Sequence, residues 1–307
     1  MHFDPAVAGA GLLVGFTVGL TGMGGGALMT PILVLLFKVE PLAAVSSDLV
    51  ASVIMKPVGG GVHLRRGTVN FALVKWLLVG SVPGAFVGVL LLRRLGEGAV
   101  IQARVKEALG VALVVAALSI AAKALLQLRA ARRELERAEE PAAGGSEVRA
   151  RPLATVLVGV AGGLVVGMTS VGSGSLMIVM LMLLYPTLSS SELVGTDLVQ
   201  AVPLVGSAAV GHLLFGDFKL DLTASLLVGC LPGVYLGARV SSRARDAVVR
   251  PALAVILLVS GLKLLDLGTP RLALVMIVVV VLALALWRVL VRLGMVRPKL
   301  MAREPSR

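Results

Sequence analysis

Two glycine-rich segments carry the residues best suited to binding chemistry. Residues 19–30 read GLTGMGGGALMT and residues 167–178 read GMTSVGSGSLMI. Each interrupts an apolar run, although glycine inside a helix costs about 1 kcal/mol relative to alanine. A helix broken in this way exposes free backbone N–H groups at the start of its second piece, where partial positive charge favours an anion. We therefore predict a small-anion site, to which the following residues contribute: Thr21, Gly22, Gly24, Gly25, Gly26, Thr169, Ser170, Gly172, Ser173, Gly174 and Ser175.

The alternative role for these small residues is close helix packing, in which glycine lets two backbones approach each other. We assign that role to Gly15 and Gly19, which are spaced four residues apart within one apolar run. For the breaks themselves we favour the anion site, because both interrupted segments precede a short apolar run. Short broken helices of this kind form substrate sites in transporters.

Acidic and hydroxyl residues follow each break. Asp48 is preceded by Ser47, and Asp197 is preceded by Thr196. Carboxyl groups inside membrane spans are energetically expensive and usually face the bundle interior or a cavity. Two roles stay open: a proton carrier that titrates as the anion moves, or a hydrogen-bonding cap for a neighbouring broken helix. A negative charge repels an anion, so the scaffold role is favoured over direct contact with the ligand.

Three further ionisable residues lie in the same two segments. His63 and His212 end the predicted helices and serve either as interfacial residues or as protonatable gates. Lys56 lies about 12 Å, or eight residues, from its helix end, and the second half has Val205 in its place. It is expected to pair with Asp48 or to attract the anion. The coupling-or-scaffold set is Ser47, Asp48, Lys56, His63, Thr196, Asp197 and His212.

The elements that must position these residues are membrane helices. The 307 residues are 57% hydrophobic and only 15% charged, whereas soluble domains carry about 25% charged residues. Apolar runs long enough to span a bilayer recur along the chain. We predict an all-α polytopic membrane protein with helices at 6–21, 27–37, 41–64, 70–92, 104–127, 153–169, 175–185, 189–214, 220–239 and 249–265, and an extra helix at 271–292.

The two halves repeat each other, a pattern that often defines an architecture. A shift of 148 residues superimposes Gly24 on Gly172, and a shift of 149 superimposes Asp48 on Asp197. Matches of glycine, proline, aspartate and histidine are informative because apolar matches are common in any membrane segment. The predicted organisation is a first transmembrane repeat (1–127), a charged cytoplasmic linker (128–151), a second repeat (152–267), and an extra C-terminal helix with a basic tail (268–307).

The basic residues suggest the orientation, because cytoplasmic loops carry an excess of Lys and Arg. With the N-terminus outside, the linker and the basic C-terminus lie in the cytoplasm. One loop disagrees, because it places Arg93, Arg94, Arg104 and Lys106 outside. Five crossings per half make the repeats inverted, a recurrent transporter plan. The alternative makes 27–37 and 175–185 re-entrant, which leaves four crossings and parallel repeats.

Several other classes are disfavoured. The net charge of +12 comes from basic clusters that lack interleaved aromatic residues, which argues against nucleic-acid binding. One cysteine, Cys230, permits no internal disulfide, and three scattered histidines suggest no metal site. Neither catalytic nor dinucleotide-binding motifs stand in the required context, so we expect no enzyme activity and no cofactor. No cleavable signal peptide is evident at the start of the chain.

With these motifs the sequence resembles the sulfite exporter TauE/SafE family of permeases. The segments GFTVGLTGMGGGALMTPILV and AAVSSDLV carry the resemblance, together with GLVVGMTSVGSGSLMIVML and ELVGTDLVQ. The segment 271–292, the long linker and the basic tail are less typical. The resemblance implies a bacterial inner-membrane secondary transporter for a small sulfur-containing anion such as sulfite, thiosulfate or a sulfonate, with proton coupling as a hypothesis and the oligomeric state open. Two alternatives are an uncoupled anion channel and a structural or assembly protein that docks a partner enzyme on 128–151.

Overall fold

A computed structural model describes residues 4–21, 25–137, 150–240 and 246–268. The chain forms two compact units, residues 1–265 and 266–307, and the fold below is that of the first. Its described part is helical, with no strand. The helices are α1 (Pro5–Thr21), α2 (Gly26–Leu35), α3 (Pro41–Arg65), α4 (Phe71–Arg94), α5 (Gly98–Arg137), α6 (Pro152–Thr169), α7 (Leu176–Leu184), α8 (Ser190–Phe215), α9 (Leu220–Val240) and α10 (Asp246–Leu264).

The predicted helices agree with these bounds to within a few residues, with one exception. Helix α5 begins at Gly98 rather than 104 and continues to Arg137. The first part of the charged linker is therefore helical, as its composition rich in alanine, glutamate and arginine suggests. The predicted extra helix at 271–292 lies outside the described residues.

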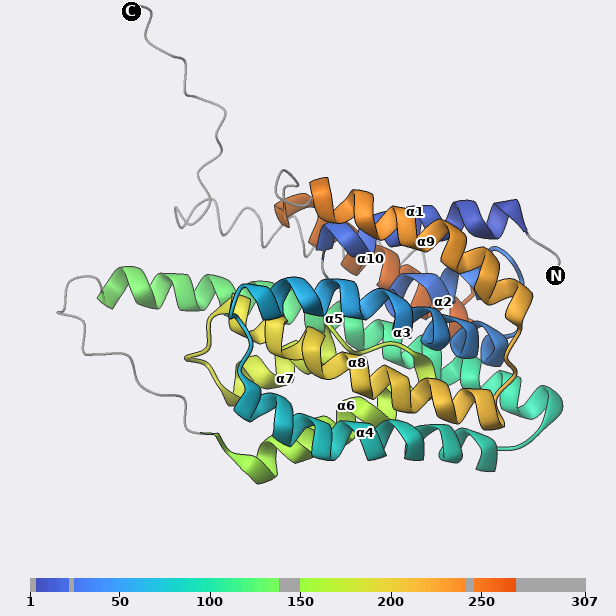
Figure 1. The fold of residues 1–307 in the computed structure, drawn as a ribbon, viewed down its shortest axis with the longest axis horizontal. Coiled ribbons are helices and arrows are strands. Elements are labelled where there is room, and N and C mark those ends of the chain that lie inside the picture. Colours follow the sequence, from blue (N-terminus) through green and yellow to red (C-terminus); the bar gives the residue numbers. More distant parts are fainter. Residues whose placement is uncertain (1–3, 22–24, 138–149, 241–245, 269–307) are drawn as a thin grey trace, which may run out of the picture. The chain divides into compact units, whose positions relative to one another are not determined.

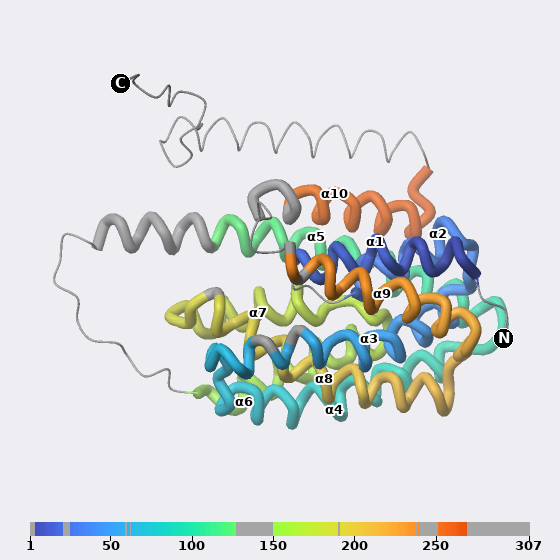
Figure 2. The backbone as a smooth tube through the Cα atoms, turned by 45° about the horizontal axis from the view of Figure 1, so that its top comes forward, coloured from blue at the N-terminus to red at the C-terminus, as the bar shows by residue number. Residues whose placement is uncertain are grey.

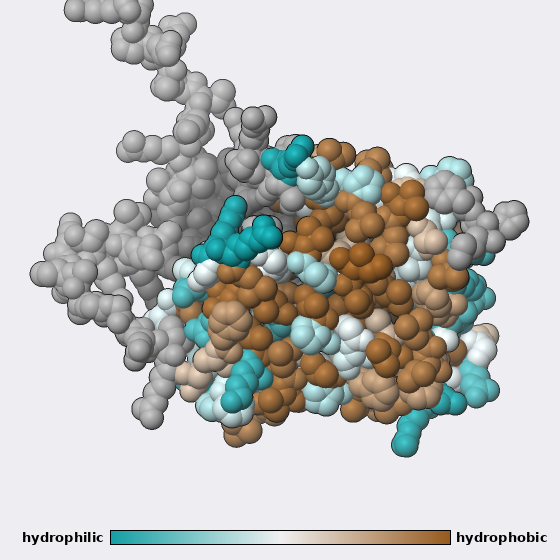
Figure 3. All heavy atoms as spheres, viewed as in Figure 1, coloured by the Kyte–Doolittle hydropathy of each residue, from teal (hydrophilic) through white to brown (hydrophobic). Residues whose placement is uncertain are grey.

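Six of the described helices are long and apolar enough to cross a membrane, namely α3, α4, α5, α6, α8 and α9. Helices α1, α2 and α10 are shorter and also apolar. Large apolar side chains such as Leu13 and Leu153 face outward, and Figure 3 shows apolar side chains over most of the visible described surface. An outward apolar surface of this size matches lipid rather than water. The protein is an all-α polytopic membrane protein.

Helix packing pairs the two halves of the chain. Helix α1 packs against α9, α4 against α6, α3 against α8, and α5 against α10 (Figures 1 and 2). Each pair joins one helix that precedes the charged linker to one that follows it. Helices α1 and α6, which open the two halves, begin at opposite ends of this unit (Figures 1 and 2).

Glycines allow the closest of these contacts. Gly84 and Gly88 of α4 lie against Val160 and Leu164 of α6, where a Cβ atom would stand 2.9 and 2.6 Å from the carbonyl oxygens of those two residues. In the α1–α9 pair, Gly15 lies on the backbone of Cys230, and Gly19 lies beside Gly237. The predicted packing role of Gly15 and Gly19 is confirmed.

We expect Gly15→Ala to destabilise the protein by about 1–3 kcal/mol, the usual cost of overpacking. The added methyl group would stand 2.5 Å from the carbonyl oxygen of Cys230. Gly9→Ala is the matched control, because nothing lies within 4 Å of a Cβ at that position of the same helix. Thermal unfolding in detergent measures both variants; equal melting temperatures would contradict the packing role.

Candidate functional site

The break between α6 and α7 is an irregular buried loop. Ser170 ends α6 in the left-handed conformation (φ 59°), and Gly172 (φ 124°) and Gly174 (φ 93°) also have positive φ. Glycine adopts such angles without strain, which explains the glycine at both positions. The hydroxyl of Thr169 donates to the carbonyl oxygen of Val165 at 2.6 Å, so it braces the end of α6.

The break between α1 and α2 faces this loop. Gly26, the first residue of α2, lies directly on the carbonyl oxygen of Ser170, and any side chain at Gly26 would overlap it. Gly25, the N-cap of α2, is buried as well. Gly22, Gly24 and the side chain of Thr21 lie outside what the structure describes. The two glycine-rich segments therefore touch at Gly26 and Ser170, although they are far apart in the sequence.

Asp48 links the two breaks. It is fully buried in α3, and its Oδ2 accepts hydrogen bonds from the hydroxyl groups of Ser170 (2.6 Å) and Thr30 (3.1 Å). Thr30 belongs to α2, so this one carboxylate oxygen ties α2, α3 and the second break together. The other oxygen, Oδ1, lies near Gly25 at the start of α2 and has no hydrogen-bond partner among the described residues.

Asp197 occupies the equivalent place in α8 with different partners. Its Oδ1 accepts a hydrogen bond from the side-chain amide of Gln200 at 3.1 Å, and the backbone amide of Gly174 lies close to the carboxylate. Its Oδ2 has no hydrogen-bond partner among the described residues, although the side chain is only 1% exposed. The 148-residue shift between the halves places Thr30 on Ile178 and Gly22 on Ser170. Ile178 and Gly22 have no side-chain donor.

Lys56 provides a buried basic group within electrostatic range of both carboxylates. Its side chain is 7% exposed, and its ammonium group donates a hydrogen bond to the hydroxyl of Ser173 in the second break. It interacts electrostatically with both Asp197 and Asp48. An ammonium group has three donors, and Ser173 takes one of them. The predicted pairing with Asp48 is not seen as an ion pair within 4 Å between these two described side chains, and a role of Lys56 in attracting the anion stays a prediction.

The remaining predicted coupling-or-scaffold residues differ in their surroundings. The hydroxyl of Ser47 is buried without a hydrogen-bond partner among the described residues, as is that of Ser175. The hydroxyl of Thr196 accepts from the backbone N–H of Asn70 at 3.0 Å, which joins α8 to the start of α4. His63 lies apart from the centre, at the partly exposed end of α3, where its Nδ1 is 2.9 Å from the hydroxyl of Thr68.

His212 is fully buried rather than interfacial. Its Nε2 lies 2.8 Å from the carbonyl oxygen of Gly167, and its Nδ1 lies 2.8 Å from the hydroxyl of Ser46. Because a carbonyl oxygen can only accept, Nε2 carries the proton that it donates to Gly167. The hydroxyl of Ser46 also donates to the carbonyl oxygen of Leu42 at 2.8 Å. The residue thus holds α8 against α6 and α3.

Three contributors escaped the sequence analysis: Thr30, Gln200 and Ser81. Gln200 lies three residues after Asp197, which places the two side chains on one helix face, and its Oε1 accepts from Ser81 of α4 at 3.1 Å. Thr30 lies one turn after Gly26 on α2. For Thr30 and Gln200 the sequence signal is helical spacing, from Gly26 and from Asp197 respectively.

We call this group the central polar cluster: Thr30, Asp48, Lys56, Ser170, Ser173 and Asp197. With every group ionised it carries two negative charges and one positive charge. Because an unpaired charge is strongly disfavoured in a buried site, the cluster favours binding steps that add no further net charge to it. No group of three or more His, Cys, Asp and Glu side chains within the described ranges is arranged to hold a metal ion.

Known proteins resemble the chain over most of its length. Probable membrane transporter protein YjnA of Bacillus subtilis (strain 168) is 40% identical over 258 residues, which cover 83% of this chain and 97% of that protein. Probable membrane transporter protein YdhB of the same organism is 24% identical over 256 residues, covering 82% and 96%. No solved structure is significantly similar to the chain.

The family comparison covers the described helical unit almost completely. The model of the family named sulfite exporter TauE/SafE matches residues 7–264, from α1 to the end of α10. This range includes both glycine-rich breaks and every member of the central polar cluster. The chain belongs to the sulfite exporter TauE/SafE family.

Proposed function

We propose that the protein is a secondary transporter that moves a small sulfur-containing oxoanion or organosulfonate across the membrane, with sulfite as the first candidate. The observation that carries this proposal is Lys56, a buried ammonium group that donates a hydrogen bond to the second break and interacts electrostatically with two carboxylates. An ionisable residue within a membrane span is by default a functional-site candidate. The membership in a family named for sulfite export supports the substrate class.

The central polar cluster offers suitable donors for a compact oxoanion, together with Ser47 and Ser175, which lie near its members Asp48 and Ser173 in the chain. Lys56 has donors beyond the one that Ser173 accepts, and the buried hydroxyl groups of Ser47 and Ser175 lack partners among the described residues. Charge-assisted hydrogen bonds from an ammonium group are about twice as strong as neutral ones. A tetrahedral or pyramidal sulfur oxoanion presents several oxygens, so it can accept from the ammonium group and from a hydroxyl at the same time.

The carboxylates suggest how a proton is coupled to the anion. Asp48 lies near the start of α2 and Asp197 near the start of α7, where helix dipoles favour a negative charge. Each carboxylate thus occupies the place that an oxoanion would prefer. A monovalent anion that enters the ionised cluster makes its net charge more negative, from −1 to −2. If one carboxylate is protonated first, the cluster with its bound anion has a net charge of only −1. We infer that anion and proton move together.

The two carboxylates receive different roles in this proposal. Asp48 is held by two hydroxyl groups from two different elements, so it acts as a scaffold that joins the breaks. Asp197 has one oxygen without a partner among the described residues and no hydroxyl donors of this kind, so it acts as the proton carrier. The sequence difference at Ile178 and Gly22 produces this division.

We further propose that the halves are inverted repeats in a bacterial inner membrane, divided near 127, 151 and 267, with the C-terminus in the cytoplasm. The opposite starting ends of α1 and α6 support the inversion (Figure 1). The packing of helices from one half on helices from the other, α1 on α9 and α4 on α6, supports it as well. Arginines 65 and 66, the linker and the α9–α10 connection then face the cytoplasm.

Uptake of radiolabelled sulfite into proteoliposomes tests this function. We expect saturable uptake that requires the protein, and a loss of about tenfold or more in Gly25→Leu and Ser173→Leu, because a leucine at either break fills buried space beside Lys56 or Asp48. Gly61→Leu is the matched control, since open space surrounds that residue. Absence of sulfite and sulfonate uptake, or unchanged uptake in both break variants, would overturn the proposal.

A further inference from the structure

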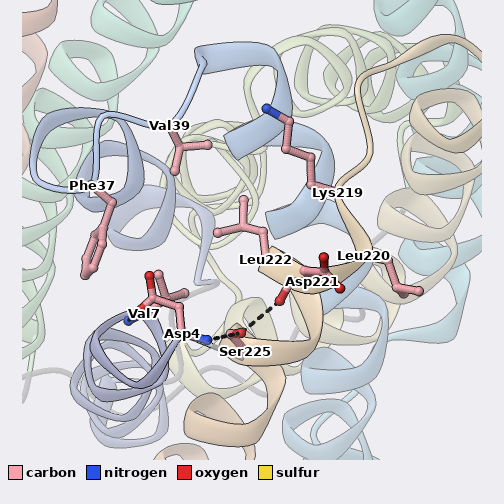
Figure 4. Close-up of a pocket in the computed structure, with 9 residues that line it drawn as sticks. All are labelled: Asp4, Val7, Phe37, Val39, Lys219, Leu220, Asp221, Leu222 and Ser225. Carbon is pink, nitrogen blue, oxygen red and sulfur yellow. Dashed lines mark hydrogen bonds between the residues drawn. The ribbon is translucent and has the colours of Figure 1, made fainter. Parts of the chain in front are cut away.

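An open pocket lies at the end of the helical unit where α1 begins. Its volume is about 500 Å³, and its walls come from the start of α1, the α2–α3 connection and the start of α9 (Figure 4). Leu222 stands between Phe37 and Lys219 in this view, and Val7 lies beside Asp4 on the same side as Phe37. The pocket therefore opens between elements of both halves, because α9 follows the linker and the other walls precede it.

The opposite end of the unit holds the equivalent elements, and there they are joined by hydrogen bonds. The 148-residue shift places Phe37 on Tyr185 and Val7 on Thr155. The hydroxyl groups of Tyr185 and Thr155 are 2.6 Å apart, and the backbone N–H of Arg151 donates to the Tyr185 hydroxyl at 2.8 Å. Tyr185 is only 3% exposed. This contact joins the end of α7 to the start of α6.

The third pair of positions shows the same asymmetry. The 149-residue shift places Leu73 on Leu222. Leu222 lines the pocket and is partly exposed, whereas Leu73 is completely buried in the same core cluster as Tyr185. The pocket thus lies at one end, whereas at the other end the aromatic side chain of Tyr185 is buried and its hydroxyl group is hydrogen-bonded.

We propose that the Tyr185–Thr155 contact is a gate, and that the pocket at the other end is the open entrance for the transported anion. The first half lacks the gate because Phe37 and Val7 have no hydroxyl groups. The structure is thus a state open at the end where α1 begins, which is the outer face in the orientation proposed above. Opening to the other face then requires Tyr185 to leave Thr155 and the backbone of Arg151.

This inference rests on the two-repeat arrangement, but not on the identity of the anion. It gives the two entrances unequal closing energies, because one closed state contains hydrogen bonds that the other cannot form. A transporter built in this way rests open to one side and exposes the other side only transiently.

Thiol labelling of matched positions tests the gate. The reporters are Leu222→Cys and Leu73→Cys, each in a Cys230→Ala background and treated with a water-soluble maleimide. We expect rapid labelling at position 222 and slow labelling at position 73. Tyr185→Phe and Thr155→Val each remove the contact, so each should raise the labelling rate at position 73 about fivefold to tenfold, the shift that corresponds to one net hydrogen bond.

The reciprocal variant adds the contact to the open end. Val7→Thr combined with Phe37→Tyr should lower labelling at position 222, whereas Val7→Thr alone supplies half of the pair and should leave it unchanged. Hydrogen–deuterium exchange of residues 151–155 checks Tyr185→Phe without any reporter cysteine; faster exchange there is expected. Equal labelling at the two positions, or no response of position 73 and residues 151–155 to Tyr185→Phe, would overturn the gate.

The labelling needs no substrate, which separates this inference from the proposed function. A protein that shows the labelling asymmetry but takes up no sulfur anion would contradict the substrate assignment and retain the gate. Sulfite uptake together with equal labelling at the two positions would support the substrate assignment and contradict the gate.

Discussion

Replacing Lys56 with methionine is expected to reduce sulfite uptake by about 10- to 100-fold. The substitution keeps an unbranched side chain that is one atom shorter and removes the ammonium group that contacts Ser173. A hydrogen bond to a charged group contributes about 1.5–3 kcal/mol, and each 1.4 kcal/mol corresponds to about tenfold in affinity. The loss should appear mainly in the concentration of sulfite needed for half-maximal uptake, because Lys56 is assigned to binding.

The matched control is Lys75→Met. Lys75 is an exposed lysine of α4 whose ammonium group lies 5.8 Å from the ring centre of Trp76. Its replacement removes the same charge from the protein and should leave uptake within about twofold, since an exposed charge is well screened by solvent. Unfolding temperatures of both variants separate a loss of binding from a loss of structure. If Lys75→Met and Lys56→Met reduced uptake equally, Lys56 would have no specific role.

The largest difference between matched variants is expected for the two buried carboxylates. Asp48→Asn should destabilise the protein by about 1–3 kcal/mol, because Thr30 and Ser170 lose the charged acceptor that they share. Asp197→Asn loses less, since Gln200 is its one side-chain donor among the described residues. Thermal unfolding in detergent measures this difference, and equal destabilisation would contradict the scaffold role of Asp48.

Asp197→Asn should instead uncouple transport from protons. One proton per monovalent anion makes a pH difference of one unit worth about 1.4 kcal/mol, so wild-type vesicles should accumulate the anion about tenfold more when the outside is more acidic by one unit. In Asp197→Asn, accumulation should no longer depend on the pH difference. Retained pH-driven accumulation in this variant would show that another group carries the proton.

The sequence predicted the helices well because apolar runs and their breakers are local features. The start of α5 was predicted six residues too late, at 104, whereas the helix begins at Gly98. Arg104 and Lys106 lie inside this helix, and Arg104 is exposed beside Glu107 at 3.4 Å. A charged residue is compatible with a membrane helix when its side chain reaches water.

Every member of the central polar cluster except Thr30 was selected from the sequence as a site residue, but their hydrogen bonds were not predicted. Lys56 and Ser173 are separated by 117 residues in the chain, and Ser170 and Asp48 by 122, so no local pattern reveals their hydrogen bonds. The repeat treated Asp48 and Asp197 as equivalent, and only their surroundings distinguish them. The mismatch between Thr30 and Ile178 is the sequence signal that the two carboxylates have different hydrogen-bond donors.

The same lesson applies to the two ends of the helical unit. Phe37 and Tyr185 differ by one hydroxyl group, and the repeat pattern counts both as aromatic. Because that hydroxyl finds Thr155 and the backbone of Arg151, the small difference has a large structural consequence. Asymmetry within a repeat is where specific function is most readily located.

The measurement that tests the account most directly is equilibrium binding of radiolabelled sulfite to the purified protein, with wild type, Lys56→Met and Lys75→Met compared side by side. We predict saturable binding to wild type and Lys75→Met that excess thiosulfate or a sulfonate displaces and chloride does not, together with a loss of about tenfold or more in affinity in Lys56→Met. Binding of equal affinity to all three proteins, or no saturable binding to any of them, would contradict an anion site at the central polar cluster.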